Sequence, residues 1–110
     1  MNNQDLLEVL AEKKTKTFDG GDLLEALRGK ELTVWLNPPG VIRDMFADKT
    51  NTEGGAETYK RYRAVVATMY ETDRALVDRL SDSIVLALFN FAWSQYLEYD
   101  EQLRKNSPSG

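Results

Sequence analysis

Residues 81–93, SDSIVLALFNFAW, decide how the rest of this chain can fold. Ser81 is a typical helix N-cap, and the acid that follows it places a negative charge in the first turn, where the helix dipole favours it. Within the apolar part, IVLALFNFAW, only Asn90 is polar, so a helix over this stretch is apolar on every side. The stretch therefore predicts a long buried central helix, running from residue 82 to about residue 104.

Beyond Ser94 the same helix becomes one-sided. Its apolar and aromatic residues are mixed with acids; they are Tyr96, Leu97, Tyr99 and Leu103. A helix that is half buried in its own fold and half amphipathic can offer a groove or a ridge to another helix.

Upstream of this helix, apolar residues recur at intervals of three and four. They are Tyr59, Tyr62, Val66 and Met69, and they predict an amphipathic helix over residues 56–71. A break around residues 72–73, followed by a short helix ending near Leu80, leads to the cap at Ser81.

The N-terminal half predicts shorter elements. Asn3 can cap a first helix with Leu6, Leu7 and Leu10 on one face. Residues 15–18 are short and β-branched, which is typical of an edge strand, and DGG at residues 19–21 is a turn. The alternation in residues 31–36 predicts a second strand, in which Leu32, Val34 and Leu36 point one way and Thr33 and Trp35 the other.

The segments on either side of this second strand are turns or short helices. Residues 22–28 fit a helix of one and a half turns closed by Gly29, which we favour, or one arm of a hairpin. The sequence NPPG at residues 37–40 must end the strand, because proline cannot donate to a ladder. A short helix over residues 40–47 and a polar loop over residues 49–55 follow.

These elements predict one mainly helical α+β domain over residues 1–105 and a flexible tail over residues 106–110. A small two-stranded element, or β-hairpin, lies in the N-terminal half of this domain.

The composition excludes several function classes. The chain has 110 residues, neither cysteine nor histidine, and a net charge of −4. A disulfide framework, a thiolate nucleophile, a Ser-His-Asp triad and an imidazole metal site are therefore ruled out. An acidic chain is also a poor generic nucleic-acid binder, because non-specific affinity comes mostly from Lys and Arg. With no signal-peptide pattern at its start and no apolar run of about 20 residues, a soluble cytoplasmic protein is expected.

Three motifs that could carry chemistry have simpler explanations. Asp100 lies two positions from Glu98 and one from Glu101, and helix positions one or two apart do not share a face; a solvated acidic face explains the three acids. DGGD at residues 19–22 lacks the ligand series of a calcium loop, and GDLLEALRGK at residues 21–30 lacks the spacing and the Ser or Thr of a phosphate loop. We therefore expect no enzyme activity, no catalytic residues, no cofactor and no metal site.

One basic-aromatic cluster remains, consisting of Lys60, Arg61 and Arg63 beside Tyr59 and Tyr62. Such a cluster can clamp phosphate and stack bases. The alternative, which we favour, is an amphipathic helix with its tyrosines inward and its bases outward. Nucleic acid is thus an unlikely partner.

Aromatic residues are the best candidates for a protein-binding surface, because Tyr and Trp bury large areas and keep a polar group. The candidate partner-binding residues are Trp35, Tyr59, Tyr62, Tyr96 and Tyr99. Core burial is the alternative for each of them. Self-association of the chain also stays open.

The order of elements in the N-terminal half carries a resemblance. The chain reads KTKTF at residues 14–18, GKELTVWLNPP at residues 29–39 and IRDMF at residues 42–46. This resembles the tail assembly chaperones of long-tailed bacteriophages, which typically carry a small β element reading gk-e-l-t-v-x-l-x-p, an Arg-Asp helix start and a helical C-terminal half. The resemblance covers about residues 10–48, and the helical half is similar in kind only.

The resemblance implies a non-enzymatic factor in tail morphogenesis. Its partners would be the phage tape-measure protein and, as a second partner, the tail-tube protein; it would act in the host cell cytoplasm and be absent from the mature virion. Such chaperones are commonly made in a second, longer form by ribosomal slippage, and residues 104–106, RKN, can be encoded by a run containing the slippery heptamer A-AAA-AAC. A tape measure exposes apolar helical surface before the tube encloses it, and an acidic helical protein could cover that surface.

The C-terminal half supports an alternative. Asp78, AWSQY at residues 92–96 and LRK at residues 103–105 resemble the helical part of some phage small terminase subunits, which form rings and recognise packaging DNA. The β segment, the Pro-Pro stop and the acidic balance fit that family poorly. An interaction domain outside phage biology is a third possibility.

Overall fold

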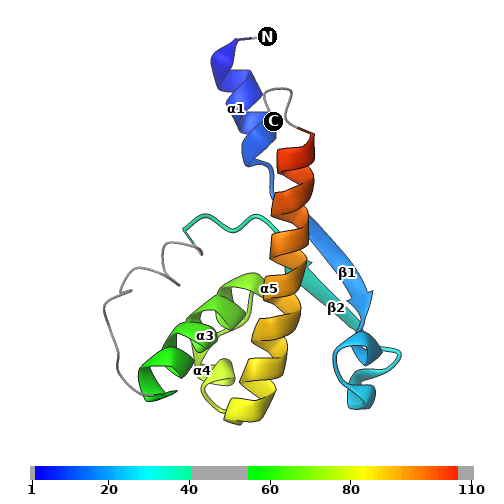
Figure 1. Cartoon of the computed structure of the whole chain (residues 1–110), viewed down its shortest axis with the longest axis vertical. Helices are drawn as coiled ribbons and strands as arrows, with labels where there is room; N and C mark the ends of the chain where they lie inside the picture. Colours follow the sequence, from blue (N-terminus) through cyan, green and yellow to red (C-terminus); the bar gives the residue numbers. More distant parts are fainter. Residues whose placement is uncertain (1, 41–54, 107–110) are drawn as a thin grey trace.

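The computed structural model describes residues 2–40 and 55–106. It has the predicted class, a mainly helical chain with one N-terminal β-hairpin and a long C-terminal helix (Figure 1). The described elements, in chain order, are α1 (Asn3–Ala11), β1 (Thr15–Asp19), the 3₁₀ turns η1 (Gly20–Asp22) and η2 (Glu25–Leu27), β2 (Glu31–Trp35), α3 (Gly55–Met69), α4 (Arg74–Val77) and α5 (Asp82–Lys105).

The two predicted strands pair as an antiparallel hairpin, in a register that sets Thr17 opposite Thr33. The predicted alternation of β2 is confirmed, since Val34 is fully buried while Thr33 is exposed. On the same face, Phe18 of β1 meets Phe91 of α5 edge to face, with ring centroids 4.9 Å apart. The hairpin therefore attaches to α5 through its apolar face.

The connection between the strands corrects one prediction. Residues 22–28 form neither a helix of one and a half turns nor a hairpin arm; the connection contains the two 3₁₀ turns, η1 and η2. Asp19 holds both ends of this connection, because its carboxylate accepts from Gly21 N at 3.0 Å and from Gly29 N at 2.8 Å. Gly29 does have the positive φ expected of a residue that ends a turn.

Three other predictions need adjustment or cannot be compared. The cap of α1 is Asn2, whose side chain accepts from Asp5 N, and not the predicted Asn3. The predicted helix over residues 40–47 and the loop over residues 49–55 lie almost wholly outside the described residues, and Gly55 already begins α3. Of the predicted tail, residues 107–110 also lie outside them.

The helices of the C-terminal half follow the predicted boundaries closely. Glu71, two residues after the end of α3, is left-handed with φ 52°, and Thr72 N closes the helix end by donating to Ala67 O at 2.9 Å. α4 is the short helix expected before the cap. Ser81 caps α5 as predicted, accepting from Ile84 N at 3.3 Å.

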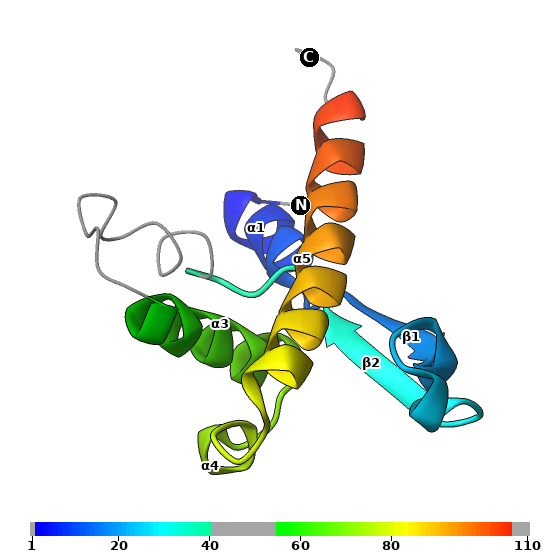
Figure 2. The ribbon, with the colours of Figure 1, turned by 60° about the horizontal axis from the view of Figure 1, so that its bottom comes forward.

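The core lies where α3, α4, α5 and the inner face of the hairpin meet. Its buried residues are Val34, Val65, Val66, Met69, Val77, Val85, Phe89 and Ala92. α5 is the central helix, as predicted, but it is buried along one stripe and not on every side. Figures 1 and 2 show the reason: α3 and the hairpin lie on two sides of α5, and its C-terminal part extends beyond both.

Candidate functional site

An aromatic ladder joins α3 to α5. It consists of Tyr59, Tyr62, Phe89, Trp93 and Tyr96, whose successive ring centroids lie 5.3, 4.2, 5.6 and 5.3 Å apart. The helical spacing of the α5 members, at i, i+4 and i+7, places them on one face. Tyr62 of α3 stacks on Phe89 of that face, and Tyr59 meets Tyr62 edge to face. Aromatic pairs of this kind each stabilise by about 0.5–1.5 kcal/mol beyond their buried area.

Three of the five predicted partner-binding residues, Tyr59, Tyr62 and Tyr96, thus belong to one continuous structure. Each is half-buried, so its ring packs against the core while part of it remains in contact with solvent. Burial raises the pKa of the Tyr96 hydroxyl, and the charge of Asp100 raises it further, against the opposing effect of Arg104. These tyrosines therefore combine core packing with a partly open aromatic surface.

Trp35 lies apart from the ladder, on the outer face of the hairpin. Its indole N–H donates to Asn37 Oδ1 at 2.9 Å, and Lys13 Nζ lies 4.8 Å from its ring centroid. Lys13 also forms an ion pair with Glu71 at the end of α3. Trp35 is half-buried and its polar group is satisfied within the chain.

Tyr99, the fifth predicted residue, lines a hollow of about 340 Å³ between the hairpin and the last turns of α5. Lys16 and Leu36 line it from the hairpin side, and Leu103 from α5. This hollow is mixed in character, since Glu98 and two glutamines also line it. The structure does not bring Tyr99 or Trp35 to the aromatic ladder.

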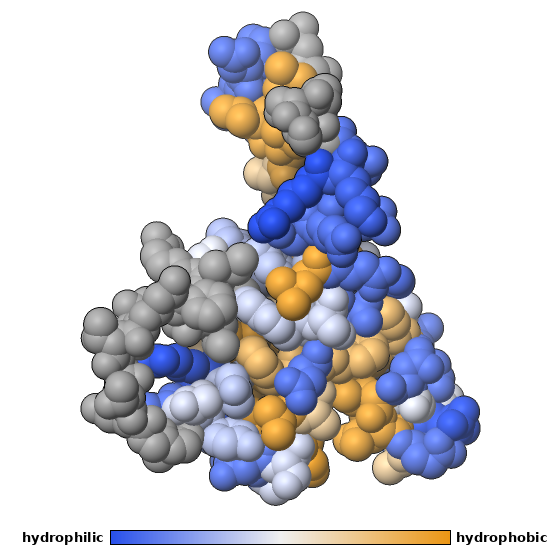
Figure 3. Space-filling model, in the orientation of Figure 1, coloured by the Kyte–Doolittle hydropathy of each residue, from blue (hydrophilic) through white to orange (hydrophobic). Residues whose placement is uncertain are grey.

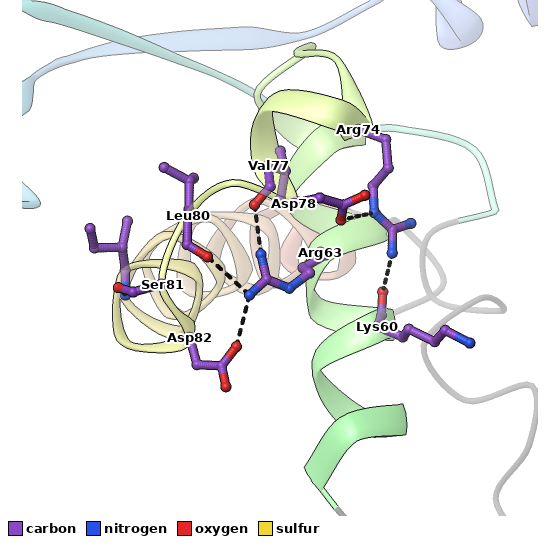
Figure 4. A network of polar contacts seen from close by, with 9 residues as sticks. Lys60, Arg63, Arg74, Val77, Asp78, Leu80, Ser81 and Asp82 are labelled. Carbon is purple, nitrogen blue, oxygen red and sulfur yellow. Dashed lines mark hydrogen bonds and ion pairs between the residues drawn. The ribbon is translucent and has the colours of Figure 1, made fainter.

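Arg63 corrects the prediction that the bases of α3 point outward. Only 15% of its side chain is exposed, and its guanidinium donates to Val77 O at 2.6 Å and to Leu80 O at 3.0 Å (Figure 4). It also forms an ion pair with Asp82 at 2.7 Å. Arg63 therefore ties α3 to the end of α4 and to the first turn of α5, and is not available to a phosphate.

The rest of the basic-aromatic cluster is divided between two environments. Lys60 is exposed, and together with Glu57, Arg61, Ala64 and Arg74 it lines a shallow hollow of about 340 Å³. The tyrosines of the cluster face the ladder instead. Bases and aromatic rings therefore do not form the joint surface that base stacking with phosphate clamping requires.

Sequence reasoning missed the most exposed apolar surface among the described residues, which is α1. No residue of α1 is buried, and its apolar residues are exposed by 50% (Leu6), 63% (Leu7), 50% (Val9) and 73% (Leu10). Figure 3 shows apolar residues gathered on this helix at the top of the molecule, above a hydrophilic belt. Leu97 and Leu103, near the end of α5, are about half exposed as well.

The signal for this surface was present in the sequence, because three leucines fall on one face of a nine-residue helix. What the pattern could not tell is whether that face meets the core. In an isolated amphipathic segment, a face that will be buried and one that will stay exposed have the same spacing.

Other kinds of site are not seen in the described part of the chain. Within residues 2–40 and 55–106, no group of three or more acidic side chains is arranged to hold a metal ion. None of the described helices has the length and apolar character needed to cross a membrane. Comparison of the chain with protein-family models, with curated proteins and with solved structures found no match.

Proposed function

We propose that this chain is a non-enzymatic assembly factor of a long-tailed bacteriophage, a tail assembly chaperone that binds the tape-measure protein during tail morphogenesis. The KTKTF and GKELTVWLNPP segments support the family, because they resemble its β element. The observation that carries the binding role is the exposed apolar face of α1.

α1 is unusual because it is a short helix whose apolar face is not buried in the described structure. Isolated helices shorter than about 12–15 residues are marginal in water, and most helices gain stability by burying an apolar face. α1 has nine residues and buries none of them, so within the described chain its stability rests on the Asn2 cap and on local bonds such as Gln4 to Glu8. A partner that covers the leucines would supply the missing burial.

The size of this face sets what the partner must provide. The exposed parts of its four apolar residues amount to roughly two whole side chains, whose burial is worth about 3–6 kcal/mol before the costs of association. Once an association cost of at least about 4 kcal/mol is subtracted, this face alone gives binding weaker than about 10 mM, so α1 needs further contacts to hold a partner tightly. An apolar helical surface on the partner fits α1 best, because two apolar helix faces can interlock along their ridges.

Co-expression with the tape-measure protein of the same phage genome tests the proposal. We expect the two proteins to co-purify, and we expect Leu10→Glu to reduce the recovered complex at least tenfold, because it places a charge in the covered face. Gln4→Glu is the matched control: it adds the same charge at an exposed residue on the polar side of α1, beside Glu8, and should retain the complex.

Two outcomes would overturn the proposal. One is the absence of a complex with the unmodified chain, together with salt-sensitive binding of DNA, which is the behaviour of a small terminase subunit. The other is equal recovery of complex with Leu10→Glu and Gln4→Glu, which would remove the apolar face of α1 from the interface. The nucleotide sequence that encodes residues 104–106 offers a further check, because the family leads us to expect a slippery heptamer there.

A further inference from the structure

The outer edge of β2 borders an apolar groove. This groove has a volume of about 360 Å³ and is lined on the other side by α3, by α4 with the residues that follow it, and by α5. The apolar lining residues are Leu32, Val66, Tyr70, Leu76, Val77, Leu80 and Leu88. In Figures 1 and 2, β2 is the strand nearer to α3 and β1 is the farther one.

The groove runs along the edge of the strand and not over one face of the hairpin. Three consecutive residues of β2, Glu31, Leu32 and Thr33, line it. Because successive side chains of a strand point to opposite faces, three neighbours can border one cavity only along the backbone edge. The groove thus gives access to the backbone of β2.

The hairpin register shows which backbone groups point into this groove. Leu36 N donates to Lys14 O at 2.7 Å and Gly20 N donates to Lys30 O at 2.6 Å, so the even-numbered residues form the hydrogen-bonded pairs. The odd-numbered pairs are the non-bonded ones, and the hydroxyls of Thr17 and Thr33 accordingly approach to 3.0 Å.

The N–H and C=O groups of Glu31 and Thr33 therefore point away from β1. Within residues 2–40 and 55–106, no backbone or side-chain group is bonded to them. An unpaired strand edge beside an apolar groove is the arrangement that strand addition uses: main-chain bonds supply affinity and alternate side chains fill the groove.

From this geometry, we propose that β2 accepts an extended segment of a partner protein as a third strand. The segment carries apolar side chains at alternate positions, which enter the groove toward Val66 and Leu88. Its other side chains are polar and lie on the outer face of the hairpin. A basic residue stands beside Glu31, whose carboxylate is exposed and has no ion-pair partner among the described residues.

The opposite edge of the hairpin is a poorer acceptor. β1 contains Lys16 and follows Lys13 and Lys14, and lysines at an edge disfavour pairing with further strands. This difference between the two edges determines where the third strand adds, which is on the α3 side of the hairpin only. This inference concerns a different surface from α1 and does not depend on the identity of the α1 partner.

Amide hydrogen exchange of the full-length chain, followed by NMR, tests the site directly. The probes are two synthetic peptides, Ac-Lys-Thr-Val-Thr-Val-Thr-Val-NH₂ and its reversed sequence, which cover both strand directions. In the free chain we expect fast exchange at Glu31 and Thr33 and slower exchange at Leu32 and Val34. One of the peptides at saturation should slow Glu31 and Thr33 at least tenfold and leave Leu32 and Val34 unchanged.

Matched variants separate backbone pairing from apolar contact. Thr33→Pro removes an outward N–H without removing a ladder bond, because Pro is tolerated at the outward position of an edge strand. It should abolish the peptide's protection of the remaining outward amide, that of Glu31. Thr17→Pro makes the same change on the outer edge of β1 and should retain it. As a test that does not alter the protein, N-methylation of the peptide amides that face β2 keeps every side chain but should abolish the protection. These amides belong to the threonines in an antiparallel third strand and to the valines in a parallel one.

Three results would overturn the site. Glu31 and Thr33 could already be protected in the free chain at all concentrations, which would mean that the chain itself closes the edge. Their protection could rise with protein concentration alone, which would assign the edge to a second copy. The third result is that neither peptide slows the exchange of Glu31 and Thr33, which would mean that the edge does not accept a strand.

Discussion

Replacing Arg63 by alanine tests how the helical half is held together. The guanidinium makes two charge-assisted hydrogen bonds, to Val77 O and Leu80 O, from a side chain that is only 15% exposed. At the lower end of the range for bonds to a charged group, these two bonds contribute about 3 kcal/mol. The Asp82 carboxylate adds little, because 66% of its side chain is exposed.

The consequences for the carbonyls are unequal. Val77 O also accepts from Leu80 N at 3.0 Å and keeps that partner, while the described structure gives Leu80 O no second donor. Arg63→Ala thus removes the bonds that join α3 to α4 and to the start of α5, and it leaves Leu80 O without a donor. Total stabilities of domains of this size are about 5–15 kcal/mol, so the loss is a large fraction.

Urea denaturation followed by far-UV circular dichroism measures the effect. With an unfolding entropy of about 2.1 cal/mol/K per residue, a loss of about 3 kcal/mol also lowers the Tm of a 110-residue chain by roughly 13 °C. Arg79→Ala is the control, because Arg79 is exposed and makes no side-chain bond within the described residues; its change should stay within about 0.5 kcal/mol.

The result that refutes this reasoning is a loss for Arg63→Ala as small as that for Arg79→Ala. A double-mutant cycle with Asp82→Ala divides the loss of stability between the ion pair with Asp82 and the bonds to the two carbonyls. We expect a coupling energy below about 1 kcal/mol, because the ion pair is largely solvated. A coupling that accounts for most of the loss would assign the link to the ion pair and not to the carbonyls.

Three further predictions concern stability. Met69→Ala, at a fully buried position, should destabilise the chain by about 2–5 kcal/mol in urea denaturation, whereas Leu10→Ala on the exposed α1 should change it by about 0.5 kcal/mol or less; equal effects would contradict the assigned core. Gly20→Ala should cost about 1–3 kcal/mol, because the new Cβ would lie 2.5 Å from the carbonyl oxygen of Leu27, and a thermal melt unchanged from the parent would contradict this close approach. Burial raises the pKa of the Tyr70 hydroxyl above its unfolded value of about 10. The contribution of this group to the free energy of unfolding is therefore complete below pH ~10, and it falls by about 1.4 kcal/mol for each pH unit above that. Tyr70→Phe should therefore make the alkaline loss of stability shallower by about that slope, and identical slopes between pH 10 and 12 would show that Tyr70 titrates normally.

Local sequence patterns were sufficient for most of the elements. β2 follows from an alternation that any half-buried strand must show, and its end follows from Pro38 and Pro39, which cannot donate to a ladder. The boundaries of α5 follow from Ser81 and from the loss of apolar character toward residue 105. These features depend on neighbours in the sequence, so the sequence contains the information.

Residues 22–28 show where local patterns became insufficient. Leu23, Leu24 and Leu27 fit a helical face, but the bonds from Asp19 to the amides of Gly21 and Gly29 draw the two strands together at their ends. A continuous helix between these anchors would have to separate them. Two 3₁₀ turns satisfy both the bonds and the hairpin.

The partly open ladder and the inward Arg63 are also outcomes of packing. The spacing of Tyr59 and Tyr62 predicts a shared face, but not that Phe89 and Trp93 complete a stack with Tyr96. Arginine at the edge of an amphipathic face can point either way. The carbonyls of Val77 and Leu80, at and just after the end of α4, accept from its guanidinium and decide its direction.

The stretch SDSIVLALFNFAW by itself determined that this chain has a long central helix and where that helix begins, because caps and apolar runs act through bonds and contacts within a few residues. Only the tertiary structure decided which sides of it are covered. The hairpin and α3 are enough to bury one stripe of α5, and α1 lies too far from the core to bury its leucines. Burial is a property of what surrounds a surface, and a sequence pattern describes only the surface itself.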